Sequence, residues 1–143
     1  MYLLKRTISP YTGPDLLLGV FISEDTAQAA RQKYLSKYLG NPRSDPWREQ
    51  AYHEVNLEDD VQLIDTVPTS SPIEDSCKAY VVSAYSEAFG QILREFKFIC
   101  PTLESAQECV TRLEDEDDGK FPFYCEIDSV IVGDLLSDLR EEY

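Results

Sequence analysis

The sequence has few of the residues on which most enzymes and metal sites depend. Its 143 residues include one histidine, one tryptophan and one methionine. The six glycines are isolated, so the sequence contains neither a phosphate-binding P-loop nor a dinucleotide fingerprint. His53 is accompanied by no G-x-S-x-G elbow, reactive-cysteine context or second histidine. We therefore expect that the protein is not an enzyme and that it has no catalytic residues and no cofactor.

The four cysteines show no metal-binding pattern. Structural zinc sites use about four nitrogen or sulfur ligands, usually in closely spaced pairs. The sequence has no C-x-x-C pair, and its cysteines are Cys77, Cys100, Cys109 and Cys125. We expect no metal site and interpret the thiols as reduced and structural, with Cys100, Cys109 and Cys125 as small core-like residues.

Long apolar runs are absent as well. A membrane-spanning helix needs roughly 20 consecutive apolar residues, and the longest apolar run here is only a few residues. The N-terminal stretch MYLLKRTISP does not have the apolar centre of a signal peptide. These features predict a cytoplasmic location and no contact with a membrane.

Positive charge is scarce. The chain has 13 Lys and Arg against 27 Asp and Glu, which gives a formal net charge of −14. Residues 1–71 contribute −3 and residues 72–143 contribute −11. Such a surface repels phosphate groups, so direct binding to nucleic acid is not expected, whereas a basic protein would be attracted. Solubility alone is the alternative explanation of the same charge.

The same order of signals occurs twice, on either side of a stretch rich in proline and serine. This stretch, residues 67–77, holds two prolines, three serines and a threonine and is typical of a linker. Tyrosine-led and apolar segments predict strands at residues 2–8 and 16–22 before it, and at residues 80–85 and 92–100 after it.

A helical pattern follows each strand pair. SEDTAQAARQKYL at residues 23–35 and TLESAQECVTRLE at residues 102–114 align at a constant offset of 79. Ser23 and Thr102 are suitable N-caps, because their hydroxyls can accept from the free N–H groups of the first turn. Apolar residues recur at helical spacing, so each helix can bury one face on a sheet.

After the helices the two halves show further strand signals. YHEV at residues 52–55 aligns with YCEI at residues 124–127, and residues 61–67 align with residues 129–135. The C-terminal LLSDLREEY predicts a short amphipathic helix. The resulting order, ββαββ twice, predicts an α+β protein.

We therefore predict two tandem ββαββ-like repeats, with antiparallel sheets, one helix packed per repeat and a pseudo-two-fold relation. The predicted boundaries are a first repeat at residues 1–67, a linker at 68–77 and a second repeat at 78–143, and the repeats could pack as one domain. Each half resembles small uncharacterised bacterial and phage ββαββ domains, in which a strand, an S/T-x-E-x-A helix and a Y-x-[IVE] strand follow one another. The resemblance covers most of each half and implies a fold without an activity. A chance echo of a common α+β rhythm is the alternative.

The densest chemical feature is LEDEDDGK at residues 113–120. With Gly119 at position 6 of a calcium loop, position 12 would be Cys125, which cannot supply the bidentate carboxylate, so an EF-hand is excluded. A helix that ends in carboxylates opposes its own dipole, and such a local cost can mark a binding surface. We interpret the cluster as a contact patch for a basic partner; a solvated loop and an adventitious ion site are the alternatives. The partner-binding candidates are Glu114, Asp115, Glu116, Asp117 and Asp118.

Two further candidates lie in the first half. A second acidic turn at residues 56–62 contains Glu58, Asp59 and Asp60. Trp47, in the insertion at residues 40–50, is a candidate interface anchor, because tryptophan is enriched at binding hot spots. It could equally pack the insertion onto the sheet.

These features favour a non-catalytic acidic binding protein, of the immunity or phage anti-defence type, that inhibits or sequesters a basic protein. The partner would be a nuclease or another defence protein, and the carboxylates would mimic the phosphates that its basic surface binds. One alternative is a small-molecule binder or sponge that uses the cleft between the repeats, in a monomer or a homodimer. Another is a structural or assembly protein of a virus or bacterium.

Overall fold

The computed structural model describes residues 1–7, 14–39, 61–64, 69, 73–88, 90–116 and 123–136. Their elements follow the order ββαβ in each half. They are β1 (Tyr2–Arg6), β2 (Leu16–Phe21), α1 (Glu24–Leu39), β3 (Val61–Ile64), β4 (Lys78–Ala88), β5 (Gln91–Cys100), α3 (Leu103–Asp115) and β6 (Phe123–Ile131). The predicted α+β class is confirmed.

The strands form two antiparallel sheets, each with three strands. Sheet A has the order β2-β1-β3 and sheet B has the order β5-β4-β6. In both sheets the first strand of the half lies in the centre, so the two halves share one topology. This match favours the interpretation of the chain as a tandem repeat.

The strand registers match in detail. The pairing of β1 with β2 shifts between Leu4 and Lys5, and the pairing of β4 with β5 shifts between Val82 and Ser83. A bulge of this kind places an extra residue in one strand and bends it locally. The two bulges occupy equivalent positions, because Leu4 and Val82 each lie two residues after the tyrosine that leads the predicted strand.

Two expectations about the last strands are wrong. Residues 124–127 and 129–135 were expected as separate strands, but β6 runs unbroken from Phe123 to Ile131. The register also gives a different equivalence between the halves, because Leu63 lies opposite Leu4 and Ile127 lies opposite Val82. Residues 61–64 therefore correspond to residues 125–128. Residues 52–55 and most of the predicted C-terminal helix lie outside the described residues.

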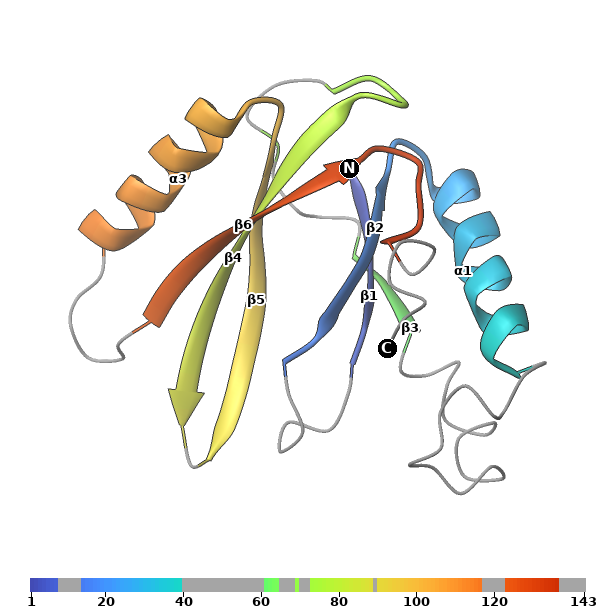
Figure 1. Ribbon diagram of the computed structural model, residues 1–143, viewed down its shortest axis with the longest axis horizontal. Helices are drawn as coiled ribbons and strands as arrows, with labels where there is room; N and C mark the ends of the chain where they lie inside the picture. The colour runs from blue at the N-terminus through green and yellow to red at the C-terminus, as the bar shows by residue number, and fades with distance from the viewer. Residues whose placement is uncertain are drawn as a thin grey trace.

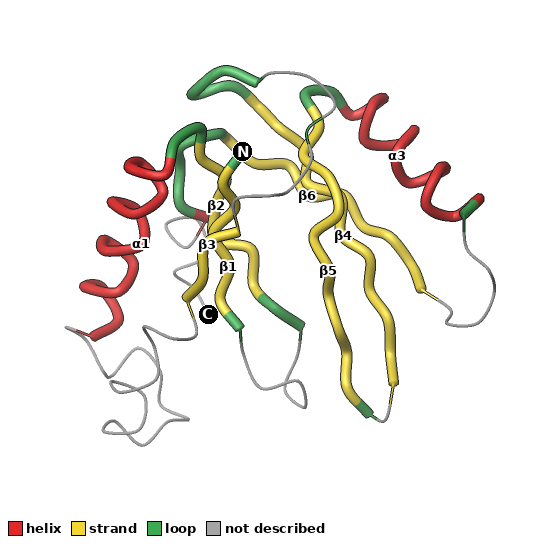
Figure 2. Tube along the Cα trace, turned by 180° about the vertical axis from the view of Figure 1, so that it is seen from behind, coloured by secondary structure: helices red, strands yellow, loops and turns green. Residues whose placement is uncertain are grey.

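The elements stack in four layers, with α1 and α3 on the outside and the two sheets between them (Figure 1). The view from behind shows the same arrangement (Figure 2). Alternation along each strand explains the layers, since successive side chains point to opposite faces of a sheet. One face of each sheet packs on its helix and the other packs on the partner sheet.

The core between the sheets combines both halves of the chain. Leu3 and Val20 of sheet A belong to the same buried cluster as Val81, Ile99 and Val130 of sheet B. Ile73, from the predicted linker, is buried in this cluster as well. The shared core favours one packed unit over two independent domains.

Each helix covers its sheet with a separate apolar cluster. Ala27, Tyr34 and Leu35 of α1 pack with buried residues of sheet A. Ala106 and Cys109 of α3 pack on sheet B. Each helix therefore buries one apolar face on its sheet, as the helical spacing of its apolar residues predicted.

The chain after β6 returns to the first half. The N–H of Gly133 donates to the carbonyl oxygen of Val20 at 2.8 Å, and Leu135 is buried in the cluster beneath α1. Gly19 permits this crossing, since an added Cβ would lie 2.8 Å from the carbonyl oxygen of Asp134. The end of the second half thus helps to hold the first half together.

Candidate functional site

The described part of the predicted acidic patch lies at the C-terminal end of α3. Glu114 and Asp115 are the last residues of the helix, Glu116 is its C-cap, and all three are exposed. The other predicted partner-binding residues lie outside the described residues: Asp117, Asp118, Glu58, Asp59, Asp60 and Trp47. The role of these residues in partner binding therefore stays a prediction.

The helix α3 has a stabilising cap at its N-terminus and unfavourable charges at its C-terminus. Thr102 and Ser105 form a reciprocal capping box, in which the Ser105 N–H donates to the Thr102 hydroxyl at 3.1 Å. This cap supports the first turn. At the other end the helix dipole favours cations, yet Arg112 is the basic residue of a last turn that runs into the three carboxylates. The order of charges is unfavourable for the helix alone.

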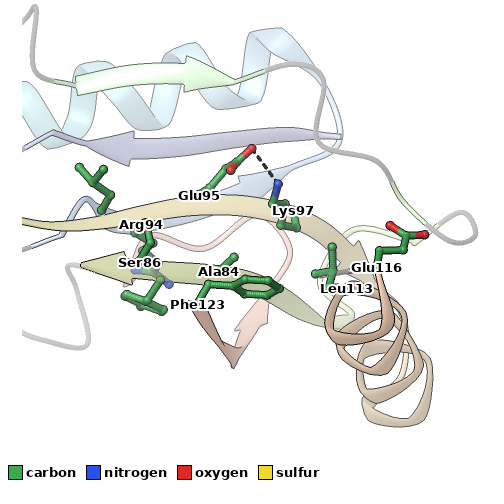
Figure 3. A pocket seen from close by; sticks show the side chains of 10 residues that line it. Ala84, Ser86, Arg94, Glu95, Lys97, Leu113, Glu116 and Phe123 are labelled. Carbon is green, nitrogen blue, oxygen red and sulfur yellow. Dashed lines mark ion pairs between the residues drawn. The ribbon is translucent and has the colours of Figure 1, made fainter. Parts of the chain in front are cut away.

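A hollow of about 490 Å³ lies beside this acidic end, over the outer face of sheet B. Apolar walls come from Leu93, Leu113 and Phe123, and polar groups at its rim come from Lys97 and Glu116. Figure 3 shows α3, with Leu113 and Glu116, bordering the hollow on one side and the strands of sheet B forming its floor. Its complete lining is Ala84, Tyr85, Ser86, Leu93, Arg94, Glu95, Lys97, Leu113, Glu116 and Phe123.

The hollow exists because sheet B is longer than the elements that cover it. The hairpin of β4 and β5 extends beyond the lower ends of α3 and of sheet A in the view of Figure 1. We call this part of sheet B, with the adjoining start of β6, the overhang. Its side chains keep large apolar areas in solvent: Leu93 of β5 is 48% exposed and Tyr124 of β6 is 54% exposed. An exposed apolar patch with polar groups around it is typical of an interaction surface.

Arg94 fixes the overhang to the rest of the molecule. Its guanidinium donates to Asp128 Oδ2 at 2.6 Å, to Ser83 Oγ at 3.0 Å and to the carbonyl oxygen of Asp15 at 3.2 Å. The Asp15 contact joins sheet B to the chain just before β2. The side chain of Arg94 is only 7% exposed, and its guanidinium also lies 4.6 Å from the centre of the Phe96 ring. The guanidinium of Arg94 therefore has a structural role, because its hydrogen bonds are made within the protein.

Two tyrosines of neighbouring strands, Tyr85 of β4 and Tyr124 of β6, stack on one another, and Tyr85 also contributes to the lining of the hollow. The rings of Tyr85 and Tyr124 have centroids 5.1 Å apart and are inclined by 7°. Burial raises the pKa of Tyr85, the Arg94 guanidinium opposes this, and Asp128, Glu126 and Tyr124 raise it further. The raised pKa keeps the Tyr85 hydroxyl neutral at physiological pH.

The cysteines divide by burial. Cys100 and Cys109 are buried beneath α3 with their sulfur atoms 3.7 Å apart, which confirms the expectation of core-facing thiols for these two. Cys125 is half-buried, and burial, followed by the negative charge of Glu114, raises its pKa, while Lys97 lowers it. Cys77 is exposed in the turn before β4.

A second hollow, of about 560 Å³, lies between α1 and the segment after β6. Thr26, Lys33 and Asp134 contribute its polar groups. Within the described ranges, no group of three or more His, Cys, Asp or Glu side chains is placed to hold a metal ion. None of the helices in that part of the chain is long and apolar enough to cross a membrane.

Sequence reasoning missed the overhang and its anchor. The alternation of REFKF in β5 and the length of FYCEIDSVI in β6 were the available signals. Neither identifies which strand portions extend past a helix, because that depends on how the layers are placed. Arg94, Tyr124 and Phe123 therefore enter only with the structure.

Comparisons with known proteins found no matching family model, no matching curated protein and no matching solved structure. The loose resemblance to bacterial and phage ββαββ domains stays an expectation.

Proposed function

We propose that the protein is a non-catalytic binding protein that docks its acidic surface on a basic protein and inhibits or sequesters it. One observation carries the proposal. The exposed Glu116, which directly follows the exposed Glu114 and Asp115 at the end of α3, borders an apolar hollow with Leu93 and Phe123 in its walls.

This combination has the composition of a protein–protein contact. Interfaces that bind well place apolar and aromatic anchors in the centre and polar groups at the rim. Here the hollow would accept an apolar side chain of the partner, and the carboxylates at the end of α3 would meet its lysines and arginines. The unfavourable charge at the helix end would be relieved in the complex, because the partner supplies the missing cations.

The net charge of −14 adds a long-range electrostatic attraction toward a basic partner. Complementary potentials raise the rate of encounter and exclude partners of the wrong sign, and salt weakens both effects. A surface that binds nucleic acid in the partner would have the required positive charge. We therefore propose that the partner is a nuclease or another defence protein that handles nucleic acid. We also propose that the protein acts in the cytoplasm.

The small-molecule alternative has less support. It relied on a cleft between the repeats, and the layer between the two sheets is filled by buried residues such as Leu3, Val81 and Ile99. The assembly-protein alternative has no specific observation in its favour.

The test is affinity capture of proteins from a cell extract with two matched variants. E114Q/E116Q removes two charges from the acidic end of α3, and E104Q/E108Q removes two exposed charges from its other turns. Exposed ion pairs contribute about 0.2–1 kcal/mol each, so E114Q/E116Q should weaken capture of a basic protein by about 2- to 30-fold.

The control should retain nearly full capture, and salt should elute the partner from the wild type. Equal retention by the wild type and both variants would show that the end of α3 is not the contact surface. Capture of acidic or neutral proteins alone would contradict the proposal.

A further inference from the structure

We infer that β5 receives an extended basic segment of the partner as an added antiparallel strand along its outer edge. This inference rests on the proposed function and specifies how the partner is held.

Within the described part of the chain, the outer edge of β5 is paired at one point only. In sheet B the strand pairs with β4 on one side, and among the described residues only Thr69 lies against its other side, as an isolated bridge to Ile99. Edge strands present a row of N–H and C=O groups that another chain can pair with. The stretch from Gln91 to Phe98 therefore offers a template for strand addition.

The usual protection of an edge is weak here. Proteins commonly blunt an edge with charged side chains or bulges. Lys97 lies at the bulge of β5, but its ammonium group is held by Glu95 at 2.9 Å. Closer to the hairpin turn, Ile92 and Leu93 are both exposed. This end of the edge is apolar and accessible.

The two faces of β5 define what the added strand should carry. On the face toward α3, Leu93 and Glu95 line the hollow, which calls for an apolar residue and then a basic residue in the partner. On the opposite face Ile92 and Phe96 call for apolar residues, because neighbouring side chains on one face of a sheet pack together. The added strand should therefore carry apolar residues opposite Ile92, Leu93 and Phe96 and a basic residue opposite Glu95.

A second copy of the chain is a poorer occupant. Pairing two copies would bring together two molecules that each carry a net charge of −14. A basic segment gains attraction from the same charge, including that of Glu114 and Glu116 at the neighbouring end of α3. Charge complementarity therefore favours a partner of the opposite sign.

The test uses a synthetic peptide of seven residues, Thr-Val-Lys-Thr-Val-Val-Lys, blocked at both ends. In an antiparallel pairing, its residues 2 to 6 are designed to lie opposite β5 from Phe96 to Ile92, so that the first lysine meets Glu95 and the valines meet the apolar residues. Binding is measured by NMR titration, with amide hydrogen exchange as a second readout. A control peptide has proline in place of the central threonine. It should bind about tenfold more weakly, because proline removes a donor from the ladder.

Strand addition also predicts that the peptide slows amide exchange within residues 91–98. Leu93→Lys should weaken binding of the parent peptide by about fivefold or more, since it replaces an apolar contact by a like charge. Leu103→Lys is the matched control, because Leu103 is 45% exposed at the start of α3, and it should bind as the wild type does.

Several results would overturn the inference. One is equal binding of the parent and proline peptides together with loss of binding in E114Q/E116Q, which would leave the proposed function intact and locate the contact at α3 alone. No binding of either peptide would overturn strand addition, and the capture experiment would then decide the proposed function separately. Slow amide exchange within residues 91–98 in the absence of peptide, together with a dimeric mass of the protein, would show that a second copy pairs with the edge.

Discussion

Replacing Arg94 by methionine tests how the two halves are joined. The variant keeps most of the side-chain volume but removes a cation that is 7% exposed, together with its hydrogen bonds to Asp128, Ser83 and the carbonyl oxygen of Asp15. A hydrogen bond to a charged group contributes about 1.5–3 kcal/mol and a neutral one about 1 kcal/mol. Relief of the buried charge offsets part of this loss, and Asp128, which is 31% exposed, regains water.

We expect R94M to lower the free energy of unfolding by about 3 kcal/mol, a large share of the 5–15 kcal/mol typical of domains. Urea denaturation followed by fluorescence measures it. R94K, which keeps the charge but loses the planar fork, should fall between the wild type and R94M. In a double-mutant cycle, D128N should cost less in the R94M background than in the wild type. A loss below about 0.5 kcal/mol in R94M would refute the role of Arg94 as the anchor.

Other predictions concern the crossing after β6, the cysteines and Tyr85. Gly19→Ala should destabilise the protein by about 1–3 kcal/mol, because the added methyl group meets the carbonyl oxygen of Asp134 at 2.8 Å; an unchanged urea midpoint would contradict this crossing. A thiol reagent should label Cys77 first and Cys125 more slowly, and mass spectrometry should find the two buried cysteines unlabelled until urea is added. Because burial raises the pKa of Tyr85, its contribution to the free energy of unfolding should be complete below about pH 10 and lost as pH rises through the folded-state pKa. Tyr85→Phe should reduce this alkaline loss, and an identical pH profile of the urea midpoint would contradict it.

The helices were predictable because their signals are local. Ser23 and Thr102 each accept a hydrogen bond from an N–H of the first turn, as their positions predicted. The small residues Ala27 and Ala106 are buried against the sheets, as the helical spacing required. Each of these predictions depends on residues within a few positions of one another.

Strand equivalence was harder to predict because pairing is not local. Tyr-x-Glu occurs at residues 52–54 and 124–126, and this local match suggested the wrong alignment. The partners of β1 and β4 instead align Leu63 with Ile127. A shift of register changes which face every side chain occupies, and short motifs carry little information about it.

The acidic part of the candidate site was predictable from the sequence, because it is local, whereas the hollow was not. The run from Glu114 to Glu116 is visible in the sequence, and so is its conflict with the helix dipole. The hollow beside it requires Leu93, Leu113 and Phe123 to meet from three elements. That meeting depends on where α3 ends over sheet B, which no single stretch of sequence specifies.

If the acidic end of α3 binds a basic partner by charge, the dissociation constant must depend on salt. For a partner captured by the wild type, we expect affinity to fall steeply as salt rises, and we expect E114Q/E116Q to have a lower affinity and a shallower salt dependence than E104Q/E108Q. An affinity that is the same at low and high salt, or the same in both variants, would contradict it.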